Sequence, residues 1–381
     1  MASGRVTFTV ASEFELDLSL ANEDPSSQLY FIDLRLLFSP SSDLAEPYFR
    51  GFLENEINKL LATTKLSGCY DFLHNYVLTH KLSILRRQAQ EMVTGTWVKA
   101  IKVESVHRSL IVQYWLDSSA SAKSWIEIGI MSSRPSTTRV GDVKRKWSPV
   151  QTPRISVRWM RGGEEVPKVE HYLDLNELSM EAILNKFIAS HKSYILQGIH
   201  DKLKQQSDPN GRALRTDLKT SENDPADCRL DMKLGVYGNS CSVVIDTFTG
   251  KPSFSPALHV SSRLDQELSS LKDPASDAHR SIGKMLCTDI HTSIENKAIN
   301  YGWQGVRNAE AKVEKGISIF GHGLYKQSFF RGQGWCEKWA IAVTTGLRGV
   351  SWWVAELYVT NQAAYWCLPV DIPVHANQLQ I

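Results

Sequence analysis

The stretch Cys69–Val93 (CYDFLHNYVLTHKLSILRRQAQEMV) constrains the fold most, because it contains neither glycine nor proline. One set of apolar residues recurs at spacings of four, three, four and three, which places it on one face of a helix: Leu78, Leu82, Leu85, Ala89 and Met92. A second set widens the apolar surface of the first half: Phe72, Leu73, Tyr76 and Val77. His74 and His80 lie six residues apart, off a common face, and no carboxylate pair accompanies them. The stretch therefore predicts an enclosed packing helix around which other elements are arranged.

Bulk composition is that of a globular chain with room for two or three domains. The 381 residues are 42% hydrophobic and 22% charged, with a net charge of +2. This charge gives no long-range attraction to nucleic acid or to an anionic membrane. Residues 1–20 lack the apolar core of a signal peptide, and no apolar run approaches the ~18 residues of a membrane span. The six cysteines are scattered without a CxxC pair, which favours reduced thiols in the cytosol or nucleus.

Alternating apolar residues predict strands in the first part of the chain. Residues 6–20 and 30–38 show this period of two and are expected to form a long antiparallel hairpin. A helix over 47–64, broken at Ser67-Gly68, precedes the packing helix. Three strands are expected after it, at 110–115, 125–131 and 155–159. The segment 132–153 is rich in Ser, Thr, Pro, Arg and Lys and predicts an exposed loop.

The second part of the chain repeats this order of elements. Ser179 is a predicted N-cap for a helix that runs to about Gln206, in which the small size of Gly198 suits close packing. Residues 207–227 are polar and predict a flexible linker. After them come strands at 229–235, at 242–248 and near Phe254, then helices over 262–271 and 276–301, which Gly302 is placed to end. Four strands close the chain: 324–330, 338–344, 351–360 and 363–368.

Hairpin, helical pair and strands thus occur twice, which predicts an α+β protein with two modules of antiparallel sheet packed against long helices. The expected domains are a first α+β module over residues 1–165, a connecting helix and linker over 166–227, and a second α+β module over 228–381.

Sequence patterns for known catalytic chemistry are missing. The chain has no GxxxxGK[ST] phosphate loop, no GxSxG nucleophile elbow and no HExxH zinc motif. No cysteine stands at zinc-ligand spacing with a histidine. We therefore expect no cofactor, no metal and no catalytic residue, although a reactive lone thiol at Cys241 or Cys336 stays open.

Two features suggest binding surfaces. Lys144, Arg145 and Lys146, followed by Trp147, form a basic cluster that could contact phosphate or an acidic protein, or lie in a solvated loop. Near the C-terminus, the adjacent Trp352 and Trp353 must face opposite sides of a strand, so at least one of them needs a cover. That cover is either a helix of the same module or a partner chain.

Six segments of the chain share their residue patterns, in the same order, with one known family. Tyr70–Tyr76 (YDFLHNY), followed by Leu82 and Leu85, is similar to the central helix of that family. Five further segments resemble it in the same order: Phe14–Leu20, Ser109–Trp115, Leu178–Leu184, Gly238–Cys241 and Val244–Asp246. Each segment is mainly a hydrophobic pattern. Because their order is shared over nearly the whole chain, the chain resembles the Mediator subunit 14 family, most closely its fungal members.

The resemblance implies a nuclear, non-enzymatic scaffold of the Mediator coactivator, acting in transcription regulation. It implies contacts with subunits of the head, middle and tail modules, and indirect links to RNA polymerase II and activators. Its repeated domains would be similar to the RWD and ubiquitin-conjugating-enzyme-like folds without a catalytic cysteine. Family members are far longer, so the chain is expected to be a partial one.

Two other classes of function remain as alternatives. One is an enzyme of unknown type with a conjugating-enzyme-like fold, in which Cys241 and Cys336 are the thiols to test. The other is a nucleic-acid-binding module, which the near-neutral charge disfavours. We expect no membrane contact and no direct sequence-specific binding of nucleic acid.

Overall fold

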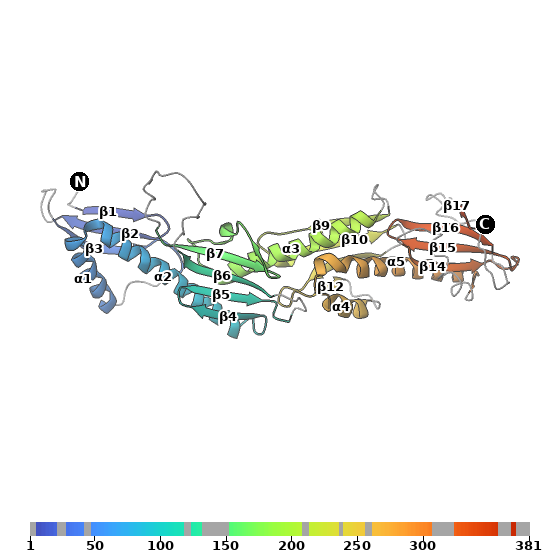
Figure 1. Ribbon diagram of the computed structural model, residues 1–381, viewed down its shortest axis with the longest axis horizontal. Coiled ribbons are helices and arrows are strands. Elements are labelled where there is room, and N and C mark those ends of the chain that lie inside the picture. Colours follow the sequence, from blue (N-terminus) through green and yellow to red (C-terminus); the bar gives the residue numbers. More distant parts are fainter. Residues whose placement is uncertain are drawn as a thin grey trace, which may run out of the picture. The chain divides into compact units, whose positions relative to one another are not determined.

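The structure is a computed structural model that describes residues 5–20, 28–41, 47–117, 123–131, 152–207, 213–235, 239–255, 261–306, 324–356 and 367–370 (Figure 1). Long helices and antiparallel sheets make up these residues, so the predicted α+β class is confirmed. Contacts divide the chain into a first unit, Met1–Asp117 with Ser121–Phe187, and a second unit, Ile188–Ile381 with Ser118–Ala120. Whether the segments 1–165, 166–227 and 228–381 fold as separate domains stays a prediction.

The first unit holds two sheets and a helical pair. Its three-stranded antiparallel sheet consists of β1 (Arg5–Val10), β2 (Phe14–Leu20) and β3 (Leu29–Leu36). The helices are α1 (Pro47–Thr63) and α2 (Lys65–Thr94). The second sheet has the order β4 (Ile101–Val106), β5 (Ser109–Tyr114), β6 (Ser124–Met131), β7 (Arg154–Arg161) and β8 (Glu164–Val166). The predicted hairpin is thus a three-stranded meander, and β4 and β8 were not predicted. The expected loop 132–153 lies outside the described residues as far as position 151.

Helix α2 is the predicted packing helix, one turn longer at its start. The predicted break at Ser67-Gly68 is wrong, because the chain turns at Lys65, which has a φ of 59°. A Cβ on Gly68 would lie 1.8 Å from Thr64 Oγ1, so glycine is needed where the first turn packs on that side chain. The buried residues repeat at helical spacing: Cys69, Leu73, His74, Val77, Leu78, Lys81, Leu82, Ile84, Leu85, Ala89 and Met92.

The five-stranded sheet β4–β8 supplies the other half of this core. Side chains alternate along β5, β6 and β7, so that one face is buried while the other, apart from Gly129, is exposed or half-buried. On the buried face, the Trp159 indole donates a hydrogen bond of 2.8 Å to the hydroxyl of Tyr114. Trp159 also packs edge-on against Phe187, with ring centroids 5.3 Å apart. The sheet therefore joins α2 to the beginning of the third helix through one aromatic core.

The second unit shows the same order of sheet, helical pair and sheet. Its four-stranded sheet comprises β9 (Leu214–Lys219), β10 (Arg229–Leu234), β11 (Ser240–Ile245) and β12 (Pro252–Ser255). The helices are α4 (Ser261–Ser269) and α5 (Pro274–Asn300). The last sheet has the order β13 (Gln304–Gly305), β14 (Leu324–Arg331), β15 (Trp339–Gly346), β16 (Gly349–Glu356) and β17 (Cys367–Val370). Residues 207–227 were predicted to be a linker, but they contain β9, which pairs along its whole length with β10.

Helix α3 (Met180–Gln206) begins in the first unit and continues into the second. Its predicted N-cap is confirmed, because Ser179 Oγ accepts a hydrogen bond of 3.2 Å from the amide of Ala182. The close packing predicted at Gly198 is also confirmed. A Cβ there would lie 3.0 Å from the carbonyl oxygen and 3.1 Å from the Cβ of Ala275 at the start of α5.

The contact at Gly198 predicts opposite effects for two helical glycines. Gly198→Val should destabilise the protein by roughly 2 kcal/mol, because the added methyl groups force α3 away from α5. Gly51→Ala in α1 should stabilise it by about 0.5–1 kcal/mol, because nothing lies within 4 Å of the new Cβ. Urea unfolding followed by circular dichroism measures both. A Gly198→Val protein as stable as the wild type would contradict the close approach of the two helices.

Candidate functional site

The predicted interaction residues lie in two parts of the chain. Lys144, Arg145, Lys146 and Trp147 fall outside the described residues. Trp352 and Trp353 lie on β16, opposite Val343 and Ala342 of β15. Nothing in the structure tests whether either group forms a binding surface, so both remain predictions.

The two tryptophans face opposite sides of the last sheet. Trp352 shares the face of Val343 and Thr345, and Thr345 Oγ1 lies 3.2 Å from Nδ1 of His291 on α5. A helix of the same unit therefore packs on that face. Trp353 lies on the other face, against a buried cluster of Phe329, Ala340, Ala342 and Ala355, and its indole donates a hydrogen bond of 3.0 Å to Thr344 Oγ1. Both side chains are half-buried.

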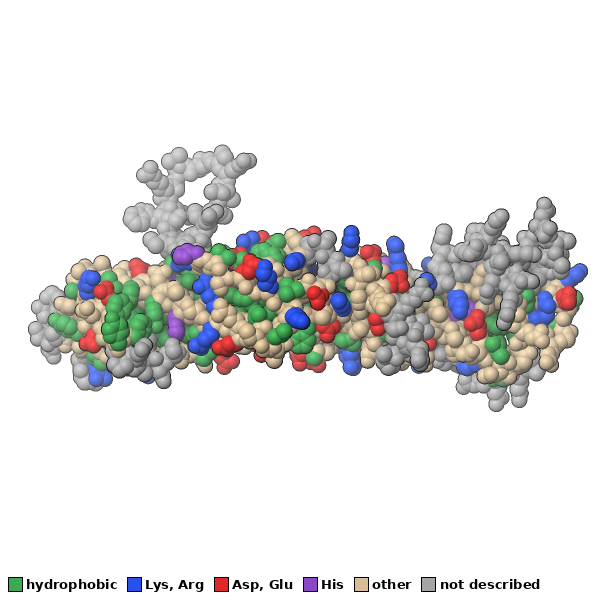
Figure 2. Space-filling model, turned by 90° about the horizontal axis from the view of Figure 1, so that it is seen from below, with side chains coloured by type: hydrophobic (Ala, Val, Ile, Leu, Met, Phe, Trp, Pro, Cys, Tyr) green, Lys and Arg blue, Asp and Glu red, His purple; other side chains and the backbone are tan. Residues whose placement is uncertain are grey.

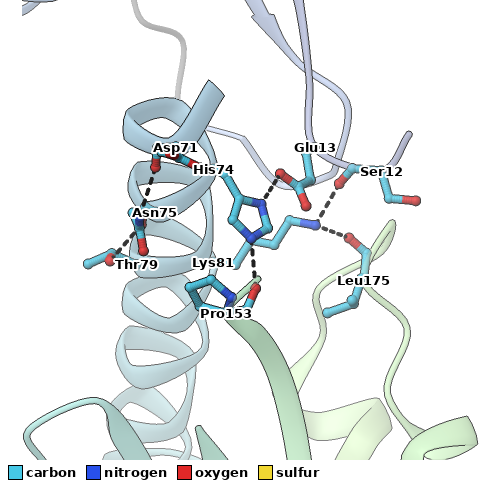
Figure 3. A network of polar contacts seen from close by, with 9 residues as sticks. All are labelled: Ser12, Glu13, Asp71, His74, Asn75, Thr79, Lys81, Pro153 and Leu175. Carbon is cyan, nitrogen blue, oxygen red and sulfur yellow. Dashed lines mark hydrogen bonds and ion pairs between the residues drawn. The ribbon is translucent and has the colours of Figure 1, made fainter. Parts of the chain in front are cut away.

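A network of buried polar contacts connects α2 with three separate segments of the first unit (Figure 3). Nδ1 of His74 lies 2.7 Å from Glu13 Oε2, in the β1–β2 turn, and Nε2 lies 2.7 Å from the carbonyl oxygen of Pro153. A carbonyl and a carboxylate can only accept. Nε2 of His74 therefore donates to the carbonyl of Pro153, and a single proton between Nδ1 and Glu13 Oε2 completes the second hydrogen bond.

Lys81 forms the second half of this network and lies about two helical turns after His74 on α2. Its side chain is only 1% exposed, and Nζ donates hydrogen bonds to the carbonyl oxygens of Ser12 at 2.6 Å and Leu175 at 2.8 Å (Figure 3). Burial lowers the pKa of Lys81 to about 8, although the negative charges of Glu13 and Asp174 act in the opposite direction. Sequence analysis missed this residue. The available signal was its position three residues after Leu78 and four before Leu85, on the apolar face of the helix.

The second unit has its own buried network around His291, which is fully buried on α5. Ser328 Oγ donates to Glu295 Oε1 at 2.6 Å, so the same hydroxyl accepts from Nε2 of His291 at 2.7 Å. Nδ1 lies 3.2 Å from the hydroxyl of Thr345, whose hydrogen can go either to this nitrogen or to the carbonyl oxygen of Lys326 at 3.3 Å. Burial lowers the pKa of His291, which keeps the ring neutral.

This grouping of serine, histidine and carboxylate does not have the geometry of a hydrolase. In a catalytic triad the carboxylate binds the second imidazole nitrogen and orients the base. Here Glu295 binds the hydroxyl of Ser328 instead, and Ser328 is only 5% exposed. The arrangement fixes α5 to β14 and β15 and presents no nucleophile to a substrate.

The thiols that the structure describes differ in accessibility. Cys69, Cys228, Cys241 and Cys287 are buried, whereas Cys336 is exposed. Burial raises the pKa of Cys241 to about 11, with Asp289 and Asp231 contributing. A thiol with this pKa is protonated at neutral pH and is a poor nucleophile. Cys241 therefore does not have the chemistry of a thioester-forming residue.

A groove with a volume of about 850 Å³ lies beside β7 and β8 of the first unit. Its lining mixes apolar side chains such as Val166 with charged ones such as Arg158 and Glu165. Arg158 Nε binds Glu165 Oε1 at 3.0 Å, and its NH1 lies 3.5 Å from Glu127 Oε2. The guanidinium holds the pKa of Glu165 below its usual range through its hydrogen bond and its charge. Lys168 and Glu170 also line the groove.

The described part of the chain holds neither a candidate membrane span nor a candidate metal centre. None of its helices is long and apolar enough to cross a membrane. Within the same residues, no three His, Cys, Asp or Glu side chains are grouped to hold a metal ion. Figure 2 shows basic and acidic side chains interspersed over the visible face. That face thus offers no continuous basic surface for a nucleic acid.

Comparison with known proteins gives a consistent result. The Fungal Med14 domain model matches residues 199–294. The chain is 35% identical to the Mediator of RNA polymerase II transcription subunit 14 of Aspergillus niger, over 94% of this chain and 31% of that protein. It is 36% identical to the protein of the same name from Aspergillus terreus, over 97% and 32%. For that of Neurospora crassa the identity is 34%, over 100% and 31%. The chain spans about a third of the length of these relatives.

Lys81→Met should destabilise the protein by roughly 2 kcal/mol at pH 7, because two buried carbonyl groups lose their donor. The loss of unfolding free energy relative to the wild type should grow as the pH rises from 8 toward about 10.4, the pKa of lysine in the unfolded chain. In that window the unfolded lysine binds more protons than the folded one, so the wild type gains about 1.4 kcal/mol per pH unit.

Urea unfolding at pH 7 and pH 9.5 measures this effect. Arg87→Met, at an exposed position on the same helix, is the control and should stay within about 0.5 kcal/mol of the wild type. If the stability difference between Lys81→Met and the wild type shrinks with rising pH, the lowered pKa of the buried Lys81 is contradicted.

Acidification should weaken the second unit through His291. Because the pKa of the folded residue lies below the unfolded value of about 6.5, the unfolded state binds more protons as the pH falls below 6.5. The stability that His291 contributes should fall by about 1.4 kcal/mol per pH unit there. Unfolding of His291→Gln between pH 7 and 5 should lack this slope, and the exposed control His107→Gln should keep it. Equal slopes in both variants would show that His291 titrates normally.

Proposed function

The chain belongs to the Med14 family, and on that premise we propose that it is an architectural segment of the Mediator coactivator complex. The observation that carries this proposal is the similarity to Mediator subunit 14 over 94% to 100% of the chain. In this role the chain would support the regulation of transcription by RNA polymerase II as a coregulator in the nucleus, without catalysing a reaction.

The use of buried ionisable groups supports a structural role. Lys81 and His291 each bind groups from other elements of their own unit, and neither of them lines the groove beside β7 and β8. Enzymes usually direct such perturbed groups toward a cleft. Their placement here favours a rigid framework over a catalyst.

The finer fold assignment is also part of the proposal. Each unit consists of an antiparallel sheet, a helical pair and a five-stranded antiparallel sheet. This order supports two repeated modules related to the RWD and ubiquitin-conjugating-enzyme-like folds, in a non-catalytic form. A repeated module would let one chain present similar surfaces to several partners.

Partners of this segment would be other Mediator subunits of the head, middle and tail modules, with RNA polymerase II and activators reached indirectly. We infer that the basic cluster Lys144–Trp147 and the tryptophans Trp352 and Trp353 contribute to these contacts. Aromatic and arginine side chains are enriched where proteins bind one another, which supports that choice. The proposal that this segment links the modules of the complex is based on the similarity to the Med14 family.

The enzyme and nucleic-acid alternatives have less support. Cys241 is buried and protonated, and Cys336 is an exposed thiol in a turn without a described histidine or carboxylate bonded to it. The net charge of +2 and the interspersed surface charges disfavour a nucleic-acid-binding module.

Co-expression tests the proposal directly. A tagged chain produced with Mediator middle and head subunits should retain those subunits on an affinity resin. A Lys144, Arg145 and Lys146→Gln variant and a Trp352→Ala variant should each retain less, if these residues contribute contacts. Leu85→Asp, which places a charge in the core of the first unit, is the control for loss of the fold.

A folded chain that never retains a Mediator subunit would contradict the proposed role. Formation of a thioester on Cys336 in the presence of activated ubiquitin would favour the enzyme instead. Circular dichroism of each variant separates loss of binding from loss of structure.

A further inference from the structure

One face of the sheet β9–β12 consists mostly of charged and hydroxyl side chains. The other face is apolar and buried, with Leu230, Met232 and Val243 at its centre. The residues of the polar face follow from the alternation along each strand: Arg215, Asp217 and Lys219 on β9, Arg229, Asp231 and Lys233 on β10, Ser240, Ser242 and Val244 on β11, and Ser253 and Ser255 on β12. All of these are exposed or half-buried.

The strand register places like charges directly opposite one another. Arg215 pairs with Lys233, and Lys219 pairs with Arg229. Between these two rows, Asp217 pairs with Asp231. Directly opposite residues have Cβ atoms roughly 5 Å apart, and like charges at such positions destabilise a sheet. The face therefore has a row of cations, a row of carboxylates and a second row of cations.

The carboxylate row is neutralised from one side. Lys219 Nζ lies 3.1 Å from Asp231 Oδ2 and 3.8 Å from Asp217 Oδ2, and Arg229 Nε lies 3.4 Å from Asp231 Oδ2. The Ser242 hydroxyl donates a hydrogen bond of 2.5 Å to Asp231 Oδ1. This bond, with Lys219 and Arg229, holds the pKa of Asp231 below its usual range. These two cations and two carboxylates thus balance one another.

The other cation row has no such balance. Neither Arg215 nor Lys233 forms an ion pair or hydrogen bond through its side chain with any residue that the structure describes. Arg215 is exposed and Lys233 is half-buried, so both side chains reach solvent. A repulsive pair of this kind reduces the stability of the sheet unless an anion lies between the two charges. Both residues fall within the segment matched by the family model.

We propose that Arg215 and Lys233 form a docking contact for an acidic segment of a partner protein. The two cations bind a pair of carboxylates, with the guanidinium of Arg215 able to take one of them in bidentate fashion. The proposal rests on the proposed role as a scaffold, to which it adds a surface and the charge of the partner.

The neighbouring row favours a protein over a nucleic acid. Same-face residues of one strand are about 6.7 Å apart, so Asp217 and Asp231 lie next to the docking cations. A continuous polyanion that crosses the face would meet these carboxylates. A peptide with one pair of acidic residues between neutral ones can place that pair on Arg215 and Lys233 without extending charge over the acidic row.

Binding of two probes tests the proposal on the full chain. The probes are a fluorescein-labelled peptide of glycine and serine with one central pair of glutamates, and a fluorescein-labelled oligothymidylate with ten phosphates, both measured by fluorescence anisotropy at low salt. Arg215→Gln with Lys233→Gln should weaken peptide binding at least tenfold. Arg280→Gln with Lys284→Gln, which removes the same charge from exposed positions of α5, should change it less than twofold.

Equal losses in both double variants, no peptide binding by the wild type, or tighter binding of the oligonucleotide would each overturn the proposal. The assay contains no Mediator subunit. If the peptide does not bind but Mediator subunits still co-purify with the chain, only the docking contact is contradicted. If the peptide binds as expected but no Mediator subunit co-purifies, only the scaffold role is contradicted.

Stability gives an independent readout. Lys233→Met keeps the length of the side chain but removes the repulsion of Arg215, so the urea midpoint should rise. Lys284→Met should leave the midpoint unchanged. A lower midpoint for Lys233→Met would show that its charge is already satisfied within the fold, and would overturn the proposal.

Discussion

A buried lysine that binds loop carbonyls is the interaction on which each unit most depends. In the first unit, Lys81 of α2 donates to the carbonyl groups of Ser12 and Leu175, which lie far from it in sequence. In the second unit, Lys192 of α3 is also 1% exposed and donates to the carbonyl of Pro225 and to Thr247 Oγ1. Burying an ammonium group costs several kcal/mol unless it is hydrogen-bonded, so each loop must keep its position for the fold to be stable.

These contacts explain how long helices can order the irregular segments beside them. A helix packed through apolar side chains alone could slide or rotate with little loss of contact area. A charge with two fixed acceptors removes that freedom, because any displacement leaves it unpaired. His74 and His291 act in the same sense, joining α2 and α5 to neighbouring turns and strands. Each unit is therefore braced by polar contacts inside an apolar core, which suits a protein that serves as a scaffold.

Sequence periodicity predicted the helices and strands of this framework, but not the buried polar contacts of Lys81 and Lys192. The long helices and most strands were found because apolar residues recur at 3.6 or 2 residues. Strand β9 was missed because its exposed positions are charged, although Leu214, Thr216 and Leu218 do alternate. The role of Lys81 and Lys192 depends on loops distant in sequence, and a single sequence does not state which carbonyls will meet them. The cation pair Arg215–Lys233 was hidden for the same reason, since it exists only through the register of β9 and β10.

Chemical labelling of lysines tests the central claim that these buried charges serve as braces rather than as reactive groups. The native chain would be treated briefly with an amine-reactive acylating reagent, and modification at each lysine measured by mass spectrometry. Lys81 and Lys192 should remain unmodified until the protein is unfolded in urea, while exposed lysines such as Lys284 react at once. Rapid modification of Lys81 or Lys192 in the folded chain would contradict the account, because it would show that the amine is accessible and nucleophilic rather than buried and hydrogen-bonded.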